Sequence, residues 1–180
     1  MTHSSGKSSL ILSLLQLVDL NEGTIAVDGV DISTISRQEI RERLISIPQD
    51  LFTLPGSIRS NADTLGTASD EEIISALKKK LGIWETLERR GGLDSVFPGN
   101  TLSQGEQQLF GLARALLRKD QSRVLILDEA TSSVDSETDS VMKNVIKEEF
   151  CHHTIISVAH RVGPYVPPHW GFNLLTCSQA

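Results

Sequence analysis

The chain has 180 residues, of which 39% are hydrophobic, enough for one globular domain with a buried core. Its formal net charge of −6 argues against a nucleic-acid-binding protein that depends on a basic face. Two cysteines, Cys151 and Cys177, cannot make a disulfide framework, and no apolar run reaches the roughly 18 residues that a membrane span requires.

The N-terminal stretch predicts a phosphate-binding loop followed by a helix. Gly6-Lys7-Ser8 leads directly into an apolar stripe, which we expect to be a buried helix over residues 9–18. In a P-loop, backbone N–H groups at a helix N-terminus cradle phosphates, the lysine reaches their outer oxygens, and the hydroxyl holds Mg²⁺. The triplet alone is a weak signal, because the first glycine of the full motif is replaced by Met1 and no strand leads into the loop.

Short strand and helix signals follow this loop. Residues 23–27 alternate like a strand and reach an Asp-Gly turn, residues 37–43 predict a short charged helix, and residues 44–47 predict a buried strand. Gln49 comes just after that strand. It is an ordinary loop residue on one interpretation, and a Mg²⁺ ligand or water-orienting group on another.

The middle of the chain is predicted to be mostly helical. Two Ser-x-x-Glu capping boxes, Ser69 with Glu72 and Ser103 with Glu106, mark helix starts. The expected helical segments cover residues 57–63, 69–80, 84–90 and about 103–118. Residues 52–118 therefore read as a helical insertion between the strands of an α/β core.

Two adjacent carboxylates end the next strand. Residues 123–127 form a short apolar run of the kind that fills a buried strand, and Asp128 and Glu129 follow it. Ligands bind at the carboxyl ends of strands in open α/β sheets, so these carboxylates are candidates for holding a cation or a phosphate group. A solvated turn is the structural alternative.

The last predicted elements are a helix over about residues 137–150 and a strand over residues 154–158. A lone histidine is usually structural, but His160 follows that strand, where it can hydrogen-bond a γ-phosphate. Residues 151–153, Cys-His-His, match no zinc spacing and fit a helix-to-strand junction. Residues 162–180 specify no element and are expected to be an unstructured tail.

Six segments in this order resemble the motifs of the nucleotide-binding domain of an ABC transporter. They are Gly6-Lys7-Ser8 (Walker A), Gln49 (Q-loop), LSQGEQ at 102–107 (signature), VLILDEA at 124–130 (Walker B), SSVD at 132–135 (D-loop) and AHR at 159–161 (H-loop). The wording of residues 47–63 and 107–117 is most similar to the multidrug-resistance-associated (C) subfamily. Because Glu129 is kept, the resemblance favours the second such domain of that subfamily.

This resemblance implies an α/β fold, namely a P-loop NTPase core of the ABC ATPase type with an inserted helical subdomain at about residues 52–118. The domain would cover residues 1–161, truncated at both ends and with its N-terminal strands missing, and residues 162–180 would be a non-homologous tail. The implied function is ATP binding and hydrolysis that powers an ABC-type transmembrane exporter. The alternative is a catalytically inactive remnant or gene-model fragment with at most a partner-docking role.

A third reading is a non-transport ABC ATPase of the DNA-repair or chromosome-organising type. Those proteins place long coiled coils between the P-loop and the signature, whereas fewer than a hundred residues intervene here. That length fits a compact helical subdomain.

The resemblance also implies roles for individual residues, with ATP and Mg²⁺ as cofactors. The residues implied to bind ATP are Ser5, Gly6, Lys7, Ser8 and Ser9, with Ser103 and Gly105 acting on ATP held by a partner. Those implied to hold Mg²⁺, directly or through water, are Ser8, Gln49 and Asp128. Those implied in catalysis are Glu129, which would polarise the attacking water, His160 at the γ-phosphate, and Gln49.

The implied partners are a second nucleotide-binding domain and the transmembrane domains of the transporter, at the cytoplasmic face of a membrane, with no nucleic acid. Some positions depart from the family pattern. Gln104 and Glu106 replace the commonest Gly and Gln of the signature, and Met1 and Ser4 stand where glycines are frequent. The aromatic residue that stacks on adenine in the family lies upstream of Met1.

Overall fold

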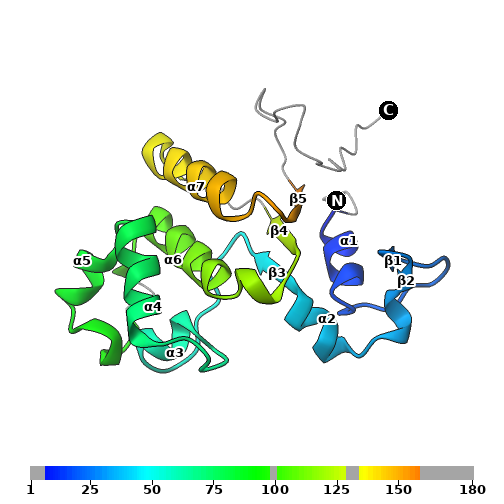
Figure 1. Ribbon diagram of the computed structural model, residues 1–180, viewed down its shortest axis with the longest axis horizontal. Helices are drawn as coiled ribbons and strands as arrows, with labels where there is room; N and C mark the ends of the chain where they lie inside the picture. Colours follow the sequence, from blue (N-terminus) through cyan, green and yellow to red (C-terminus); the bar gives the residue numbers. More distant parts are fainter. Residues whose placement is uncertain (1–6, 98–100, 129–133, 159–180) are drawn as a thin grey trace, which may run out of the picture.

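A computed structural model describes residues 7–97, 101–128 and 134–158 (Figure 1). Within these ranges, an antiparallel hairpin pairs β1 (Ala26–Val27) with β2 (Val30–Asp31). A parallel sheet has the order β3–β4–β5, formed by β3 (Leu44–Ile47), β4 (Val124–Asp128) and β5 (Thr154–Val158). The α-helices in these ranges are α1 (Lys7–Leu14), α2 (Arg37–Arg43), α3 (Ile58–Ala62), α4 (Asp70–Ser75), α5 (Trp84–Glu88), α6 (Gln104–Leu117) and α7 (Ser136–Glu149). The other helical elements are the 3₁₀ turns η1 (Ile32–Thr34), η3 (Gly92–Asp94) and η5 (Lys119–Gln121), and the π-helical η2 (Ala76–Lys80).

The parallel sheet is covered on both faces. Alternate residues of each strand point to opposite sides and pack in different clusters. Leu125 of β4 and Ile155 of β5 belong to the large core cluster that α6 and α7 help to form. Ile126 and Val158 belong to a second cluster with Ile11 of α1. Figure 1 shows the sheet between α6 and α7 on one side and α1 on the other. This is the α/β arrangement predicted from the sequence.

Helix α6 is the centre of the core. Two side chains of this helix, Phe110 and Leu112, are fully buried. The centroid of the Phe110 ring lies 4.6 Å from that of Phe97. Burial of one such side chain stabilises the fold by about 1.5–3 kcal/mol. The same helix packs against β3, α7 and the helical segments between β3 and β4. Its position therefore depends on the sheet and on these helices together.

The predicted capping boxes are confirmed at both helix starts. The backbone N–H of Ser69 donates to Oε2 of Glu72 at 2.7 Å, and the hydroxyl of Ser69 accepts from the Glu72 N–H. The helix that begins there reaches Lys80 as predicted, but its last turn is π-helical rather than α-helical. In this wider turn, Nζ of Lys80 pairs with Oε1 of Glu149 on α7 at 2.5 Å.

The expectation of a buried helix over residues 9–18 is wrong in part. Helix α1 ends at Leu14, and Gln16 adopts a φ of +50°, a left-handed conformation that terminates helices. Ile11 is buried, whereas Val18 is 41% exposed. The stripe is apolar along its length, but the sheet reaches only the part of it near Ile11.

The predicted strand over residues 23–27 is also shorter in the structure, where β1 covers Ala26–Val27. Its Asp-Gly turn is confirmed, since Asp28 and Gly29 have φ angles of +51° and +79°. Both values suit the tight hairpin turn that a two-residue loop requires. Among the residues that the structure describes, no helix is long and apolar enough to cross a membrane.

Candidate functional site

Two predicted site residues share the carboxyl edge of the sheet. The parallel strands are in register, with Ile47 paired to Leu127 and Asp128 paired to Val158. Their carboxyl ends therefore lie at the same edge. Gln49, two residues beyond β3, and Asp128, the last residue of β4, come together there by topology. Gln49 is exposed and Asp128 is half-buried.

The start of α1 approaches this edge. In Figure 1 the N-terminal end of α1 lies beside the end of β5, and Ile11 shares an apolar cluster with Val158, the last residue of β5. Helix α1 begins at Lys7, and Ser9 in its first turn is exposed. A helix start carries unpaired backbone N–H groups and the positive end of the helix dipole, which together favour an anion.

A second group of predicted residues lies at the start of α6. The Ser103 hydroxyl accepts from the Glu106 N–H at 3.2 Å, and Oε2 of Glu106 accepts from the Ser103 N–H at 2.7 Å. Gly105 is buried against Thr138 and Asp135, at the start of α7. Gly105 of the signature thus contacts the first residues of α7, and the starts of α6 and α7 form one junction.

Asp135 fixes the start of α7 from its N-cap position. Its Oδ1 accepts from the N–H groups of Glu137 and Thr138 at 3.0 and 2.9 Å, and its Oδ2 accepts from the Thr138 hydroxyl at 2.8 Å. The hydrogen bonds from the Thr138 backbone and side chain are the largest causes that hold the pKa of Asp135 below its usual value. The carboxylate is therefore ionised at neutral pH, beside the buried Gly105.

The loop after β3 is held by residues that the sequence analysis did not single out. Gln108 of α6 is 4% exposed, and its Nε2 donates to the carbonyl of Gln49. Arg114, on the same helix, donates to the carbonyl of Phe52 at 2.6 Å and to that of Asn61 at 2.5 Å. Burial lowers the pKa of Arg114 to about 10, which leaves the guanidinium charged at pH 7. The available sequence signal was one arginine within an otherwise apolar helical run.

Four predicted site residues fall outside the described residues. They are Ser5, Gly6, Glu129 and His160. For Lys7 and Ser8, the structure establishes their place in the first turn of α1. The candidate site is therefore defined by three described places, which are the start of α1, the carboxyl edge of β3 and β4, and the start of α6.

The donor set at the sheet edge suits a hard divalent cation. Asp128 offers a carboxylate, Gln49 an amide oxygen and Ser8 a hydroxyl, all oxygen ligands of the type that Mg²⁺ prefers. Magnesium commonly takes one or two protein ligands and completes its shell with water and phosphate oxygens. Within the described ranges, no three His, Cys, Asp or Glu residues gather as metal ligands. Nε2 of His153, part of the Cys-His-His run, lies 2.9 Å from the Lys119 carbonyl instead.

Comparison with known proteins identifies relatives of the chain. The sequence profile of the ABC transporter family matches residues 3–132. The chain is 50% identical to ABC multidrug transporter B of Aspergillus fumigatus over 158 residues. This alignment covers 88% of the chain and 11% of that protein. It is 48% identical to ABC transporter gloK of Glarea lozoyensis, over 88% of the chain and 12% of that protein. It is 42% identical to human ATP-binding cassette sub-family C member 2, over 88% of the chain and 10% of that protein. The chain thus spans about a tenth of the length of these curated relatives.

Proposed function

Since the chain belongs to the ABC transporter family, we propose that it is a nucleotide-binding domain, which binds ATP with Mg²⁺ and hydrolyses it to power an exporter. One structural observation carries the proposal: β3 and β4 are neighbouring parallel strands, so Gln49, two residues beyond β3, and Asp128, the last residue of β4, lie at the same edge of the sheet. The P-loop NTPase core has a parallel sheet with helices on both faces. Residues 52–118 are its inserted helical subdomain, residues 1–161 are the domain, and residues 162–180 are a separate tail.

The phosphate site in this proposal is built around the start of α1. Backbone N–H groups of residues 5–9 bind phosphate oxygens, and the ammonium of Lys7 neutralises the charge shared by the β- and γ-phosphates. Ser8, Gln49 and Asp128 hold Mg²⁺ directly or through water. When bound, the cation neutralises charge on the phosphates during transfer. Phosphoryl transfer depends chiefly on such positioning and charge neutralisation.

The hydrolytic step depends on two residues that follow the strands at the same edge. Glu129 orients the attacking water and accepts its proton, a role worth about 10²–10⁴-fold in rate. His160, which follows β5 in the sequence, donates a hydrogen bond to the γ-phosphate. Retention of Glu129 supports assignment to the second nucleotide-binding domain of a C-subfamily transporter.

The signature residues act on a partner in this proposal. Ser103 and Gly105, at the N-terminus of α6, contact ATP held by a second nucleotide-binding domain, where the helix dipole favours the phosphate charge. The pair of domains works on transmembrane domains from the cytoplasmic face of the membrane. The site is complete only when the two domains meet across the nucleotide.

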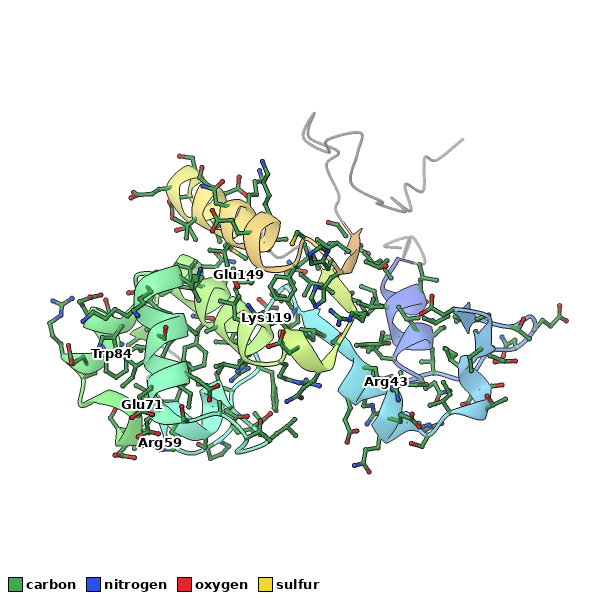
Figure 2. All side chains as sticks on the ribbon, viewed as in Figure 1. Arg43, Arg59, Glu71, Trp84, Lys119 and Glu149 are labelled. Atoms are coloured by element: carbon green, nitrogen blue, oxygen red, sulfur yellow. The ribbon has the colours of Figure 1, made fainter. Side chains whose placement is uncertain are left out.

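Replacement of the proposed catalytic carboxylate tests this function. ATP binding and phosphate release are measured for the parent chain, for Glu129→Gln, and for a matched control, Glu71→Gln. Glu71 is exposed on α4 (Figure 2). We expect Glu129→Gln to bind ATP like the parent and to lose at least about 100-fold in turnover, with Glu71→Gln unchanged.

Two results would count against the proposal. Tight ATP binding by the parent without turnover would favour the inactive, partner-docking alternative. Equal turnover by the parent and Glu129→Gln would remove Glu129 from the mechanism.

A further inference from the structure

The carbonyl of Gln49 is bound by a side chain from the signature helix. Gln108 lies 59 residues further along the chain, and its Nε2 donates to that carbonyl. The Gln108 side chain is 4% exposed, whereas Gln49 is exposed. A buried amide that loses its acceptor leaves a donor unsatisfied, which destabilises the fold. The contact therefore anchors the backbone two residues beyond the end of β3.

The rest of this loop is held separately. Arg114 binds the carbonyl of Phe52, and the fully buried Asn61 binds both the N–H and the carbonyl of Leu54 at 2.8 and 2.9 Å. Nη2 of Arg114 also donates to Oδ1 of Asn61 at 3.2 Å. These contacts anchor the loop beyond Gln49. Gln108 thus holds the loop at Gln49 itself.

The same helix carries the signature at its start. Ser103, the N-cap of α6, lies five residues before Gln108, so the two residues belong to one rigid element. We propose that Gln108 is a positioning residue: it sets Gln49 at the Mg²⁺ site and transmits movement of the signature helix to it. This inference rests on the proposed function. It adds a residue that acts through Gln49 without touching the nucleotide.

The test compares Mg²⁺ dependence in a double-mutant cycle. Gln108→Met keeps the length of the side chain and removes the donor. Gln108→Asn keeps an amide one methylene shorter and serves if the Met variant does not fold. Each is made in the parent chain and in Gln49→Ala. The control, Gln38→Met, alters an exposed glutamine on α2.

The readouts are ATP turnover and the Mg²⁺ concentration that gives half-maximal turnover. We expect Gln108→Met to lower turnover about tenfold and to raise the half-saturating Mg²⁺ concentration several-fold, within the usual range for coupled neighbours. In the Gln49→Ala background, the same substitution is expected to have almost no further effect. Gln38→Met is expected to match the parent.

Three outcomes would overturn this role, and the first two separate it from the proposed function. Independent losses from Gln108→Met and Gln49→Ala that multiply in the double variant would show that Gln108 does not act through Gln49. Reduced turnover at an unchanged half-saturating Mg²⁺ concentration would show a merely structural residue. In both cases the activity of the parent leaves the proposed function standing. A parent chain that binds no ATP would overturn the proposed function and this inference together.

Discussion

Gly105 at the start of α6 lies so close to Thr138 at the start of α7 that a Cβ on the glycine would sit 3.0 Å from the Thr138 Oγ1 and 3.3 Å from its Cγ2. The same Cβ would lie 3.5 Å from Oδ2 of Asp135, which the Thr138 hydroxyl also binds. The absence of a side chain at position 105 thus lets the two helix starts meet. The starts of α6 and α7 are packed as one unit.

Gly105→Ala is expected to disturb function more than stability. Alanine favours a helix over glycine by about 1 kcal/mol, and this gain offsets part of the roughly 1–3 kcal/mol that overpacking costs. The net change in the free energy of unfolding should stay within about 2 kcal/mol. Since the new methyl group pushes α6 away from Thr138, we expect turnover to fall at least about tenfold. Urea denaturation and phosphate release measure the two effects.

The matched control for this substitution is Gly66→Ala. Gly66 has a φ of +67° and no atom within 4 Å of an added Cβ, so its cost comes from backbone strain alone. It should lower stability without changing turnover per folded molecule. Unchanged turnover in Gly105→Ala would contradict the packing argument.

Asn61→Ala is expected to be among the most destabilising single changes in the chain. The Asn61 side chain is fully buried, and it binds the Leu54 N–H, the Leu54 carbonyl and the Ser57 carbonyl. Alanine leaves these part-buried loop groups without their buried partner, and we expect a loss of about 2–4 kcal/mol in the free energy of unfolding. Chemical denaturation measures it.

Asn144→Ala is the control for that experiment. Asn144 is exposed on α7, where alanine is the better helix former, so the expected change is within about 0.5 kcal/mol. If Asn61→Ala were as stable as Asn144→Ala, the loop after β3 would not depend on this hydrogen-bond network.

Glu149 gives stability a defined pH dependence. Its carboxylate pairs with Lys80 and Lys119, each at 2.5 Å, and Figure 2 shows Glu149 and Lys119 close together. Hydrogen bonds from Lys119 and then Lys80 hold the pKa of Glu149 below its ordinary value of 4.5. A lowered pKa in the folded state means that the stabilisation is complete above pH 4.5 and is lost as pH falls below it.

Lys80, which pairs with Glu149, contributes a pH dependence of stability with the opposite sign. The hydrogen bond to Glu149 raises the pKa of Lys80 above 10.5. The stabilisation that protonated Lys80 contributes is therefore complete below that pH and is lost as pH rises through the folded-state pKa.

Glu149→Gln is expected to lower stability by about 1 kcal/mol near pH 7 and by less below pH 4. The control is Glu88→Gln, which alters an exposed carboxylate on α5. A constant difference from pH 3 to pH 7 would contradict the assignment.

Features fixed by local chemistry were predictable from the sequence. The capping boxes at Ser69 and Ser103 involve residues only three positions apart, and the structure contains both. The three strands of the parallel sheet were found because each is a short apolar run. The end of α1 was not found, because an apolar stripe does not reveal how much of it the sheet covers.

The candidate site divides in the same way. Gln49 and Asp128 were identified from their places after apolar strands, and the register of the sheet brings those strand ends together. The contacts of Gln108 and Arg114 with the loop join residues 53 to 62 positions apart. No local pattern specifies such contacts, since they depend on how α6 packs across β3.

The most direct test of the central claim is the dissociation constant for ATP, measured by equilibrium dialysis with and without Mg²⁺. The parent chain is compared with Lys7→Met and with Lys147→Met, whose lysine is exposed on α7. We predict that Mg²⁺ tightens ATP binding, and that Lys7→Met weakens it at least about tenfold through loss of the phosphate-binding charge. Lys147→Met should bind like the parent. Equal affinities in all three chains, or no binding by the parent, would contradict the assignment of a nucleotide site at the start of α1.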